Sequence, residues 1–146
     1  MHNNTNNLET LITYLANRVT PQRWSKIQEI ACARTDYLAI VLEDIQTIHN
    51  ASAVIRSAEC FGINDVYIIE NKHQFSLHND VSKGADKWVD IHVFNDPKAN
   101  NVLPCYNTLR NQGYTIVATT PHPRGCSLNN LTIDNKIALV FGTEQK

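Results

Sequence analysis

A strand–helix–strand pattern between residues 37 and 69 constrains the fold of this chain more than any other feature. Apolar runs at 37–42 and 65–69 have the length and the β-branched content of buried strands. The segment 49–62 between them is long enough for a helix, and a βαβ unit of this kind is almost always right-handed. Because open α/β sheets bind ligands at the carboxyl ends of their strands, the loop 43–50 is an expected site of chemistry.

The central helix is expected to bury one face. Its apolar residues recur at the i, i+3, i+4, i+7 spacing typical of such a helix, at Ala51, Val54, Ile55, Ala58 and Phe61. Asn50 stands at the expected N-cap, and Gly62 follows the last periodic residue, where glycine can adopt a positive φ. Ser52, Arg56 and Glu59 fall on the polar side. Arg56 therefore has a plain structural interpretation as a surface arginine paired with Glu59.

The rest of the chain repeats the alternation of strand and helix. Further strands are predicted at 89–94, 114–119 and 137–141, and a further helix at 102–112 before Gly113. Near-continuous apolar strands alternating with helices indicate an α/β fold with a Rossmann-like, mostly parallel sheet covered on both faces. Two amphipathic helices precede the first strand, so we expect a helical extension over residues 1–35 and a partial domain over residues 36–146.

The two N-terminal helices carry several basic side chains. Thr20 is a suitable cap for the second helix, and Pro21 suits its first position. Arg18 and Arg23 lie on or beside these helices. A solvated charged face is the ordinary explanation of such residues, and contact with RNA phosphates is the alternative.

Composition limits the function classes that this chain can serve. The 146 residues are 42% apolar and 18% charged with a formal net charge of −1, so the basic excess of a dedicated nucleic-acid binder is missing, although a local patch stays open. The four cysteines are widely spaced and no His-Glu-x-x-His occurs, so we expect no metal site. Cys32 and Cys60 fall on predicted helices, where we expect buried thiols. We see no apolar run of about 18 residues and no signal peptide, and therefore expect no membrane partner and a cytoplasmic location.

Two stretches of the chain form a pair of motifs. The stretch 49–62 contains Asn50, a short apolar turn, Ile-Arg-Ser-Ala at 55–58 and a final Phe-Gly pair. The stretch 139–144 reads Leu-Val-Phe-Gly-Thr-Glu. In this order and spacing they resemble the first and second motifs of the SpoU/TrmH family of RNA ribose 2′-O-methyltransferases, in the SPOUT superfamily.

The resemblance extends over most of the chain, from about residue 8 to residue 146. The segments 84–89 and 117–119 also fit the family. Asn50-x-Ser52 and the short N-terminal helices are most similar to the TrmH group, whose members methylate a D-loop guanosine of tRNA.

The resemblance implies a fold, a cofactor and partners. In this family a Rossmann-like domain of the SPOUT (alpha/beta knot) type ends in a trefoil knot that holds S-adenosylmethionine, and a third motif closes the cofactor site. That motif is expected beyond Lys146, so we expect this chain to lack the C-terminal knot segment and to be the N-terminal portion of a methyltransferase. The resemblance also implies tRNA as a partner and a homodimer in the full-length protein.

The resemblance further implies roles for individual residues. It implies catalytic roles for Arg56, Asn50 and Glu144, and cofactor contacts for Thr119 and Gly142. RNA contacts are expected for Arg56, Ser52, Lys83, Arg23 and Arg18. Each position also has a plain explanation, such as a helix cap, a strand-end threonine, a turn glycine or a solvated charge.

The chemistry of ribose methylation bears on the role of Arg56. The 2′-oxygen must attack the methyl carbon of a sulfonium in line, so the two groups must be held close together. An arginine side chain has a pKa above about 12 and is a poor general base. We therefore expect Arg56 chiefly to bind the adjacent phosphate and to stabilise the developing alkoxide.

The leading hypothesis is S-adenosylmethionine-dependent 2′-O-methylation of the D-loop guanosine of tRNA. A ribosomal RNA substrate is one alternative, and a non-catalytic RNA-binding module of the same fold is another. An unrelated nucleotide-binding α/β domain lacks support, because the sequence contains neither Gly-x-Gly-x-x-Gly nor a P-loop.

Overall fold

The chain divides into two compact units, Met1–Arg34 and Thr35–Lys146. The structure, a computed structural model, describes residues 3–75, 84–122 and 125–143. The division lies one residue before the boundary expected from the sequence.

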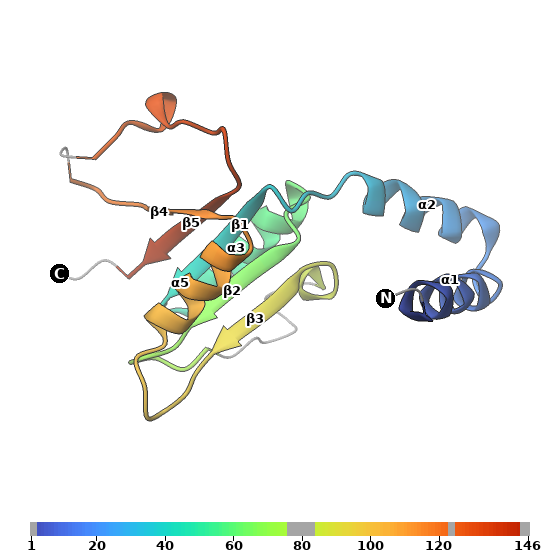
Figure 1. Cartoon of the computed structure of the whole chain (residues 1–146), viewed down its shortest axis with the longest axis horizontal. Coiled ribbons are helices and arrows are strands. Elements are labelled where there is room, and N and C mark those ends of the chain that lie inside the picture. The colour runs from blue at the N-terminus through green and yellow to red at the C-terminus, as the bar shows by residue number, and fades with distance from the viewer. Residues whose placement is uncertain (1–2, 76–83, 123–124, 144–146) are drawn as a thin grey trace. The chain divides into compact units, whose positions relative to one another are not determined.

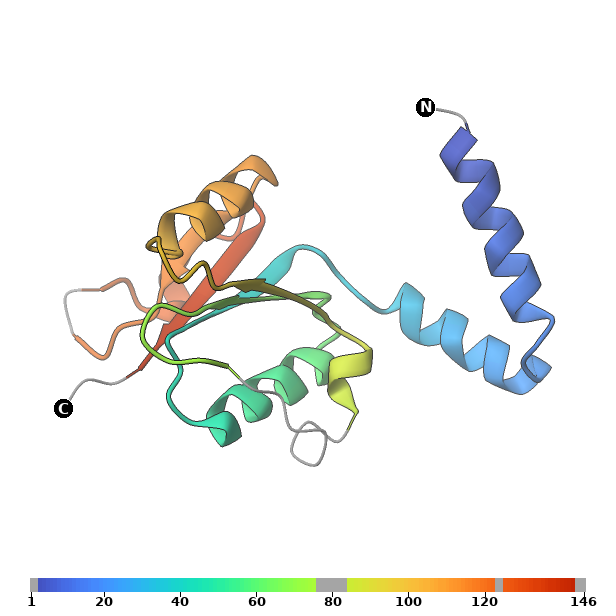
Figure 2. The same ribbon diagram turned by 90° about the horizontal axis from the view of Figure 1, so that it is seen from below.

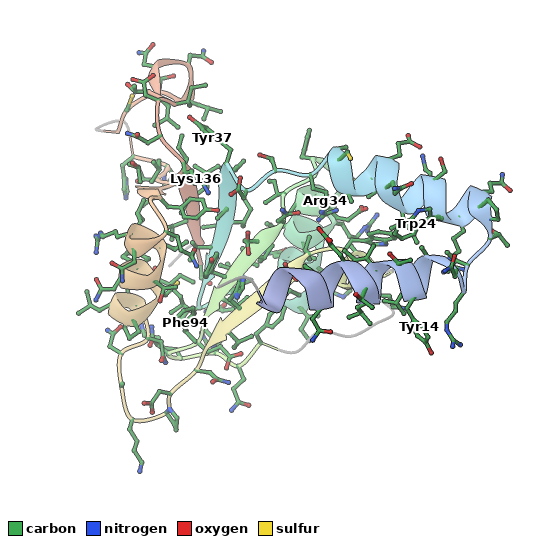
Figure 3. The ribbon with its side chains drawn as sticks, turned by 45° about the vertical axis from the view of Figure 1, so that its right-hand side comes forward. Tyr14, Trp24, Arg34, Tyr37, Phe94 and Lys136 are labelled. Carbon is green, nitrogen blue, oxygen red and sulfur yellow. The ribbon has the colours of Figure 1, made fainter. Side chains whose placement is uncertain are left out.

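The first unit consists of the helices α1 (Asn3–Ala16) and α2 (Pro21–Cys32) (Figure 1). The Thr20 side chain accepts a hydrogen bond from the Arg23 backbone N–H at 3.3 Å, which confirms the expected start of α2. The guanidinium of Arg18 lies 4.1 Å from the centre of the Tyr14 ring. Figure 3 shows Tyr14 on α1 and Trp24 on α2.

The second unit is built on a parallel sheet. Its strands in the described residues are β1 (Leu38–Glu43), β2 (Asp65–Ile69), β3 (Asp90–Phe94), β4 (Thr115–Ala118) and β5 (Ile137–Gly142). They lie in the order β3-β2-β1-β5-β4, with every neighbouring pair parallel (Figure 1). The predicted strands agree with these bounds to within one residue at each end, and the expected α/β fold with a parallel sheet is confirmed.

Helices cover the sheet on both faces. Figure 2 shows α3 (Ile48–Cys60) below the sheet and α5 (Val102–Asn111) above it. The short η1 (Ala85–Lys87) contacts α3, and η2 (Leu128–Asn130) lies in the connection from β4 to β5.

Alternation along the strands divides the core into two layers. On β1, Ile40 and Leu42 pack with Ile55 of α3, whereas Ala39 and Val41 face the layer below α5. Ile55 is fully buried. Burial of one such side chain is worth about 1.5–3 kcal/mol. Because side chains alternate between the two faces of a strand, neighbouring residues of β1 contribute to different layers of the core.

The amino edge of the sheet is pinned by polar contacts. Lys136 pairs with Asp36 at 2.5 Å, and the Tyr37 hydroxyl donates a hydrogen bond to the Ile133 carbonyl. Figure 3 labels Tyr37 and Lys136 at this end of the sheet. The Tyr114 hydroxyl donates to the Asp36 carbonyl at 2.6 Å. These contacts hold the starts of β1, β4 and β5 together, at the opposite end from the strand ends that face the candidate site.

The start of α3 differs from the sequence prediction. The helix begins at Ile48 with Thr47 at its N-cap, so the expectation that Asn50 caps it is wrong. Asn50 lies in the first turn, where its backbone N–H donates to the Thr47 carbonyl at 3.1 Å.

The buried face of α3 is also rotated relative to the prediction. Its centre is Ile55, and it includes Ser52, which is only 1% exposed, so the expectation that Ser52 lies on the polar side is wrong. Phe61, expected in the core, is 80% exposed because it lies beyond the last helical residue, Cys60. The small side chain of Ser52 is buried on this face, whereas the large side chain of Phe61 lies past the end of the helix and is exposed.

The end of α3 follows the prediction. Gly62 has φ 72°, the left-handed conformation that glycine adopts without a Cβ penalty. The Gly62 N–H donates to the Glu59 carbonyl at 3.0 Å, and the Ile63 N–H donates to the Ala58 carbonyl at 2.9 Å. These two bonds form a Schellman motif, which ends the helix and turns the chain toward β2.

Candidate functional site

A hollow of 360 Å³ opens at the carboxyl ends of β1, β4 and β5. This volume lies within the range of about 300–1,000 Å³ that is typical of small-molecule pockets. The hollow is lined by Glu43, Asp44, Gln46, Lys72, His73, Tyr106, Ala118, Thr119, Val140, Gly142 and Thr143. The loop after β1 was expected to contribute to the site, and Glu43, Asp44 and Gln46 of that loop line the hollow.

Thr119 and Gly142, expected from the sequence to contact a cofactor, lie together at this hollow. The Thr119 backbone N–H and its hydroxyl both donate to the Val140 carbonyl, each at 2.9 Å, so the residue is anchored to β5. Gly142 pairs with Glu43 across the sheet, and a Cβ built on it would meet no atom within 4 Å. Open space therefore adjoins the Gly142 backbone, as close approach of a ligand requires.

Asp44 organises the loops around the hollow. Its backbone has φ 49°, a left-handed conformation that few residues other than glycine, asparagine and aspartate adopt. Its carboxylate oxygen Oδ1 accepts hydrogen bonds from the backbone N–H groups of Asn71 and Lys72, both at 2.7 Å, and more distantly from His73 at 3.4 Å. Burial opposes ionisation, but these N–H groups outweigh it and hold the pKa of Asp44 below its ordinary value.

Glu43 faces the hollow beside two groups that stay protonated at neutral pH. Burial and the nearby Glu43 carboxyl raise the pKa of the Cys105 thiol to about 12. The same two causes raise the pKa of Tyr106, whose hydroxyl lies 3.4 Å from Glu43 Oε2. The hollow thus combines the carboxyl groups of Glu43 and Asp44 with the basic groups of Lys72 and His73.

The first-motif residues lie on α3 and do not line this hollow. Arg56 is exposed, and in the described part of the chain it forms no ion pair with Glu59, so the plain pairing of these two residues is not seen. Asn50 is exposed as well. The Ser52 hydroxyl is buried without a hydrogen-bond partner among the described residues, so it is not available on this surface for direct contact with RNA.

The remaining predicted site residues lie elsewhere. Arg18 and Arg23 are exposed residues of the first unit. Lys83 and Glu144 lie outside the described residues. The structure therefore brings together the two expected cofactor contacts, and does not gather the whole predicted set into one pocket.

Several residues of the hollow were missed from the sequence. Asp44, Lys72, His73 and Tyr106 line it, yet none belongs to the motifs that were recognised. The Glu43–Asp44 pair directly after a buried strand was an available signal for the first of these. Tyr106 comes from α5, and nothing in the local sequence indicates that it reaches the end of β1.

A second hollow of 520 Å³ adjoins the first. It lies along β4 and the connection to β5, and it shares Ala118 and Thr119 with the first hollow. Its other lining includes the apolar side chains Val117, Leu128, Leu131 and Leu139. A polar hollow and a more apolar one thus meet at the end of β4.

The described residues contain neither a candidate metal cluster nor a candidate membrane span. Across residues 3–75, 84–122 and 125–143, no group of three or more His, Cys, Asp or Glu side chains is arranged to hold a metal ion. In the same residues, no helix has the length and apolar character needed to cross a membrane.

The cysteines differ from the expectation that Cys32 and Cys60 are buried on helices. Cys32, Cys60 and Cys126 are exposed, and Cys105 is the fully buried thiol among the described residues. Cys60 is the last residue of α3, and Cys32 is the last residue of α2, a helix with no buried residue.

Comparisons with curated proteins identify relatives. The chain is 39% identical over 133 residues to the tRNA (guanosine(18)-2′-O)-methyltransferase of Borreliella burgdorferi, a match that covers 91% of this chain and 59% of that protein. It is 25% identical over 126 residues to the enzyme of the same name from Thermus thermophilus, covering 86% of this chain and 62% of that protein. The chain thus spans about 60% of the length of these relatives.

Solved structures share the fold. The TrmH/SpoU tRNA modifying enzyme of A. aeolicus superposes with a TM-score of 0.71 at 22% identity, covering 84% of this chain and 60% of that one. The SpoU methyltransferase AviRb from Streptomyces viridochromogenes, in complex with the cofactor AdoMet, superposes with a TM-score of 0.60 at 19% identity, covering 80% of this chain and 44% of that one. The family model described as SpoU rRNA Methylase matches residues 37–146, more than half of the sequence. The strand-end hollow, the parallel sheet and this match lead to one conclusion, that the chain belongs to the SpoU rRNA methylase family.

Proposed function

We propose that the protein to which this chain belongs transfers a methyl group from S-adenosylmethionine to the ribose 2′-oxygen of the D-loop guanosine of tRNA. The observation that carries this proposal is the 39% identity to the Borreliella burgdorferi tRNA (guanosine(18)-2′-O)-methyltransferase over 91% of the chain. The hollow at the carboxyl ends of β1, β4 and β5 supports it, since this is where open α/β sheets bind small ligands.

The residues of the hollow suit S-adenosylmethionine. The open space beside Gly142 admits a ligand close to the backbone, and the anchored Thr119 presents its polar atoms from the neighbouring strand end. The acidic Glu43 favours a positively charged ligand group such as a sulfonium or an amine. When bound, this cofactor supplies an electrophilic methyl group.

The chain's own residues would bind and orient the RNA. Arg56 is exposed, unpaired with Glu59, and can form bidentate hydrogen bonds to a phosphate next to the reacting ribose. Its positive charge would then stabilise the alkoxide as the 2′-hydroxyl loses its proton. We propose that Asn50, in the first turn of the same helix, orients the loop that presents this site, and that Glu144 supports it from the second motif.

Further contacts belong to the same proposal. Arg18 and Arg23 of the first unit, together with Lys83, would bind tRNA phosphates. Each such contact makes the affinity for tRNA fall more steeply as the salt concentration rises. We also propose that the full-length protein is a cytoplasmic homodimer, as the family resemblance implies.

The test begins with calorimetric titration of S-adenosylmethionine into the chain and, alongside, into the Borreliella burgdorferi relative. Each protein is then tested for transfer of the labelled methyl group from tritiated cofactor to a tRNA transcript. The same test is made on a transcript already 2′-O-methylated at guanosine 18. The proposal predicts label in the first transcript and none in the second.

Other results would contradict the proposed substrate or the proposed activity. Equal label in both transcripts, or label only in ribosomal RNA, would overturn the tRNA substrate. Binding of RNA without binding of cofactor would favour the alternative of a non-catalytic RNA-binding module. That alternative is kept because the chain spans about 60% of the length of its curated relatives.

A further inference from the structure

We infer that Asp44 is a positioning residue, which holds the loops after β1, β2 and β5 in the arrangement that binds the methyl donor. The inference rests on the proposed function for the identity of the ligand, but the holding of the loops can be measured independently. Asp44 lines the hollow and belongs to neither of the two motifs recognised in the sequence.

The backbone of Asp44 fixes the first loop. Its φ of 49° turns the chain sharply at the end of β1, and its N–H donates to the Ile69 carbonyl at 2.9 Å. An aspartate adopts this conformation more readily than most residues, whereas a β-branched or bulky side chain would be strained there. The turn therefore depends on the type of residue at this position.

The carboxylate of Asp44 fixes the second loop. Three consecutive backbone N–H groups, those of Asn71, Lys72 and His73, converge on its Oδ1 atom at 2.7, 2.7 and 3.4 Å. Hydrogen bonds from N–H groups to a carboxylate are roughly twice as strong as bonds between neutral groups. Lys72 and His73 both line the hollow, so this one oxygen sets the position of part of its wall.

The carbonyl of Asp44 fixes the third segment. The hydroxyl of Thr143 donates to it at 2.6 Å, and Thr143 directly follows Gly142. Both Gly142 and Thr143 line the hollow. One residue thus connects the end of β1 with the segments that follow β2 and β5.

A second anchor holds the β2 loop from its other side. Asn101 is 3% exposed, and its backbone N–H donates to the side-chain oxygen of Asn71 at 2.8 Å. Its side-chain amide donates to the carbonyls of Glu70 at 2.8 Å and Asp96 at 3.1 Å. Loss of the Asp44 carboxylate should therefore loosen the loop locally without unfolding it, and the effect can be separated from global destabilisation.

Three variants separate the contributions of Asp44. Asp44→Gly keeps the left-handed backbone and removes the carboxylate. Asp44→Asn keeps an acceptor oxygen and removes the charge. Asp44→Ala removes the carboxylate and also strains the left-handed backbone, so it should raise exchange at residues 71–73 at least as much as Asp44→Gly. Asp36→Asn is the matched control, because Asp36 is an exposed aspartate paired with Lys136 at the far end of the sheet.

The first readout is amide hydrogen exchange at residues 71–73. We expect exchange to rise about tenfold or more in Asp44→Gly, to rise less in Asp44→Asn, and to stay unchanged in Asp36→Asn. Unchanged exchange in Asp44→Gly would overturn the inference.

The second readout is the pH dependence of the Asn71 and Lys72 amide proton shifts. In the wild type these shifts should titrate with Asp44, and the midpoint should lie below the ordinary aspartate pKa of about 3.9. The titration should be missing in Asp44→Asn. Shifts that titrate equally in both proteins would contradict the bonding of these N–H groups to the Asp44 carboxylate in solution.

The third readout is the affinity for S-adenosylmethionine, measured by calorimetry. We expect Asp44→Gly to weaken binding by about 10–100-fold, the loss seen when a group that orients the ligands of a metal ion is removed. Asp44→Asn should restore part of the loss. Faster exchange at residues 71–73 with unchanged affinity would overturn the positioning role.

The proposed function and this inference fail in different ways. If the wild-type chain binds no S-adenosylmethionine, the proposed cofactor site of this chain fails. The holding of the loops by Asp44 is then supported or overturned by the exchange and shift measurements alone.

Discussion

Cys105 and the three other cysteines have opposite surroundings, and their reactivity should differ accordingly. Only a thiolate attacks an alkylating reagent, and the pKa of Cys105 is raised to about 12 by burial and by Glu43. Cys32, Cys60 and Cys126 are exposed. We expect iodoacetamide at pH 8 to modify these three readily and to leave Cys105 unmodified in the folded protein, as read by mass spectrometry.

A denatured sample supplies the control, since all four thiols should then react. Modification of Cys105 at the rate of Cys126 in the folded protein would show that the core between α5 and the sheet opens frequently.

Arg56 should matter for catalysis and little for stability. It is exposed and unpaired with Glu59, so Arg56→Ala should change the melting temperature only slightly. Removal of one group that stabilises a developing oxyanion typically lowers kcat about 10²–10³-fold. We expect a loss of this size in an active, full-length form of the protein, with the affinity for S-adenosylmethionine unchanged.

Glu59→Gln distinguishes this role from simple helix pairing. If Arg56 acted only through Glu59, the two variants would lower activity equally. The proposal expects Glu59→Gln to retain nearly full activity.

Single residues also show where prediction from sequence ends. Thr119 and Gly142 could be placed at one site because the family resemblance implied a cofactor contact for each, and both line the same hollow. Asp44 could not be assigned its contacts, because its N–H donors at 71–73 lie 27 to 29 residues away in the chain. Side-chain to backbone bonds of this kind leave no periodic pattern in a sequence.

Among the elements, the C-terminal turns of α3 and α5 use the same device. Gly113 follows α5 with φ 87°, and the N–H groups of Gly113 and Tyr114 donate to the Arg110 and Leu109 carbonyls, each at 3.0 Å. This repeats the Schellman motif of Gly62. Both glycines were predictable, because each directly follows the last residue of a helix predicted from the sequence.

A pair of glycine substitutions should separate backbone strain from loss of ligand space. A Cβ at Gly113 or at Gly142 would meet no atom within 4 Å, but of the two only Gly113 has a positive φ. Gly113→Ala should therefore lower the free energy of unfolding by about 1–2 kcal/mol. Gly142→Ala should leave stability nearly unchanged and weaken binding of S-adenosylmethionine. Denaturant unfolding and calorimetry measure the two effects.

Equal loss of stability in both glycine variants would contradict the assignment of strain to Gly113. Unchanged cofactor affinity in Gly142→Ala would place the ligand away from this strand end.

At the element level, the helix α3 shows how tertiary packing overrides a local pattern. Its period was recognised, but its buried face turned out to be centred on Ile55 and to include Ser52. The exact face depends on which side of the helix meets η1 and the sheet, and this contact joins segments distant in the sequence.

For the molecule as a whole, the two units should contribute very differently to stability. In the described part of the chain every residue of the buried core lies between Ala39 and Val140, and none of residues 7–34 is buried. We expect removal of residues 1–34 to leave the melting temperature of the second unit within a few degrees of the intact chain. Far-ultraviolet circular dichroism would show the loss of the helical signal of residues 1–34. The thermal transition of the near-ultraviolet signal would give the melting temperature of the second unit.

A large fall in melting temperature on this removal would contradict the independence of the second unit. Removal of residues 137–143, which include β5, is the matched control. It should abolish cooperative unfolding, since β5 pairs with both β1 and β4.

The order of the strands is the whole-molecule property that the sequence did not supply. Each strand was predicted from its own apolar run, but the order β3-β2-β1-β5-β4 depends on which runs pair. A local pattern defines an element, whereas pairing between residues about 100 positions apart is decided by packing on both faces.

This strand order has a consequence for biosynthesis. β1, β2 and β3 emerge from the ribosome first and can pair with one another as soon as they are available. β4 has β5 as its neighbour in the sheet, so the nascent chain carries β4 without a hydrogen-bonded partner until residues 137–142 have left the exit tunnel. Unpaired strand edges recruit other chains, so the codons between β4 and β5 are where slow translation would most favour aggregation of the newly made protein.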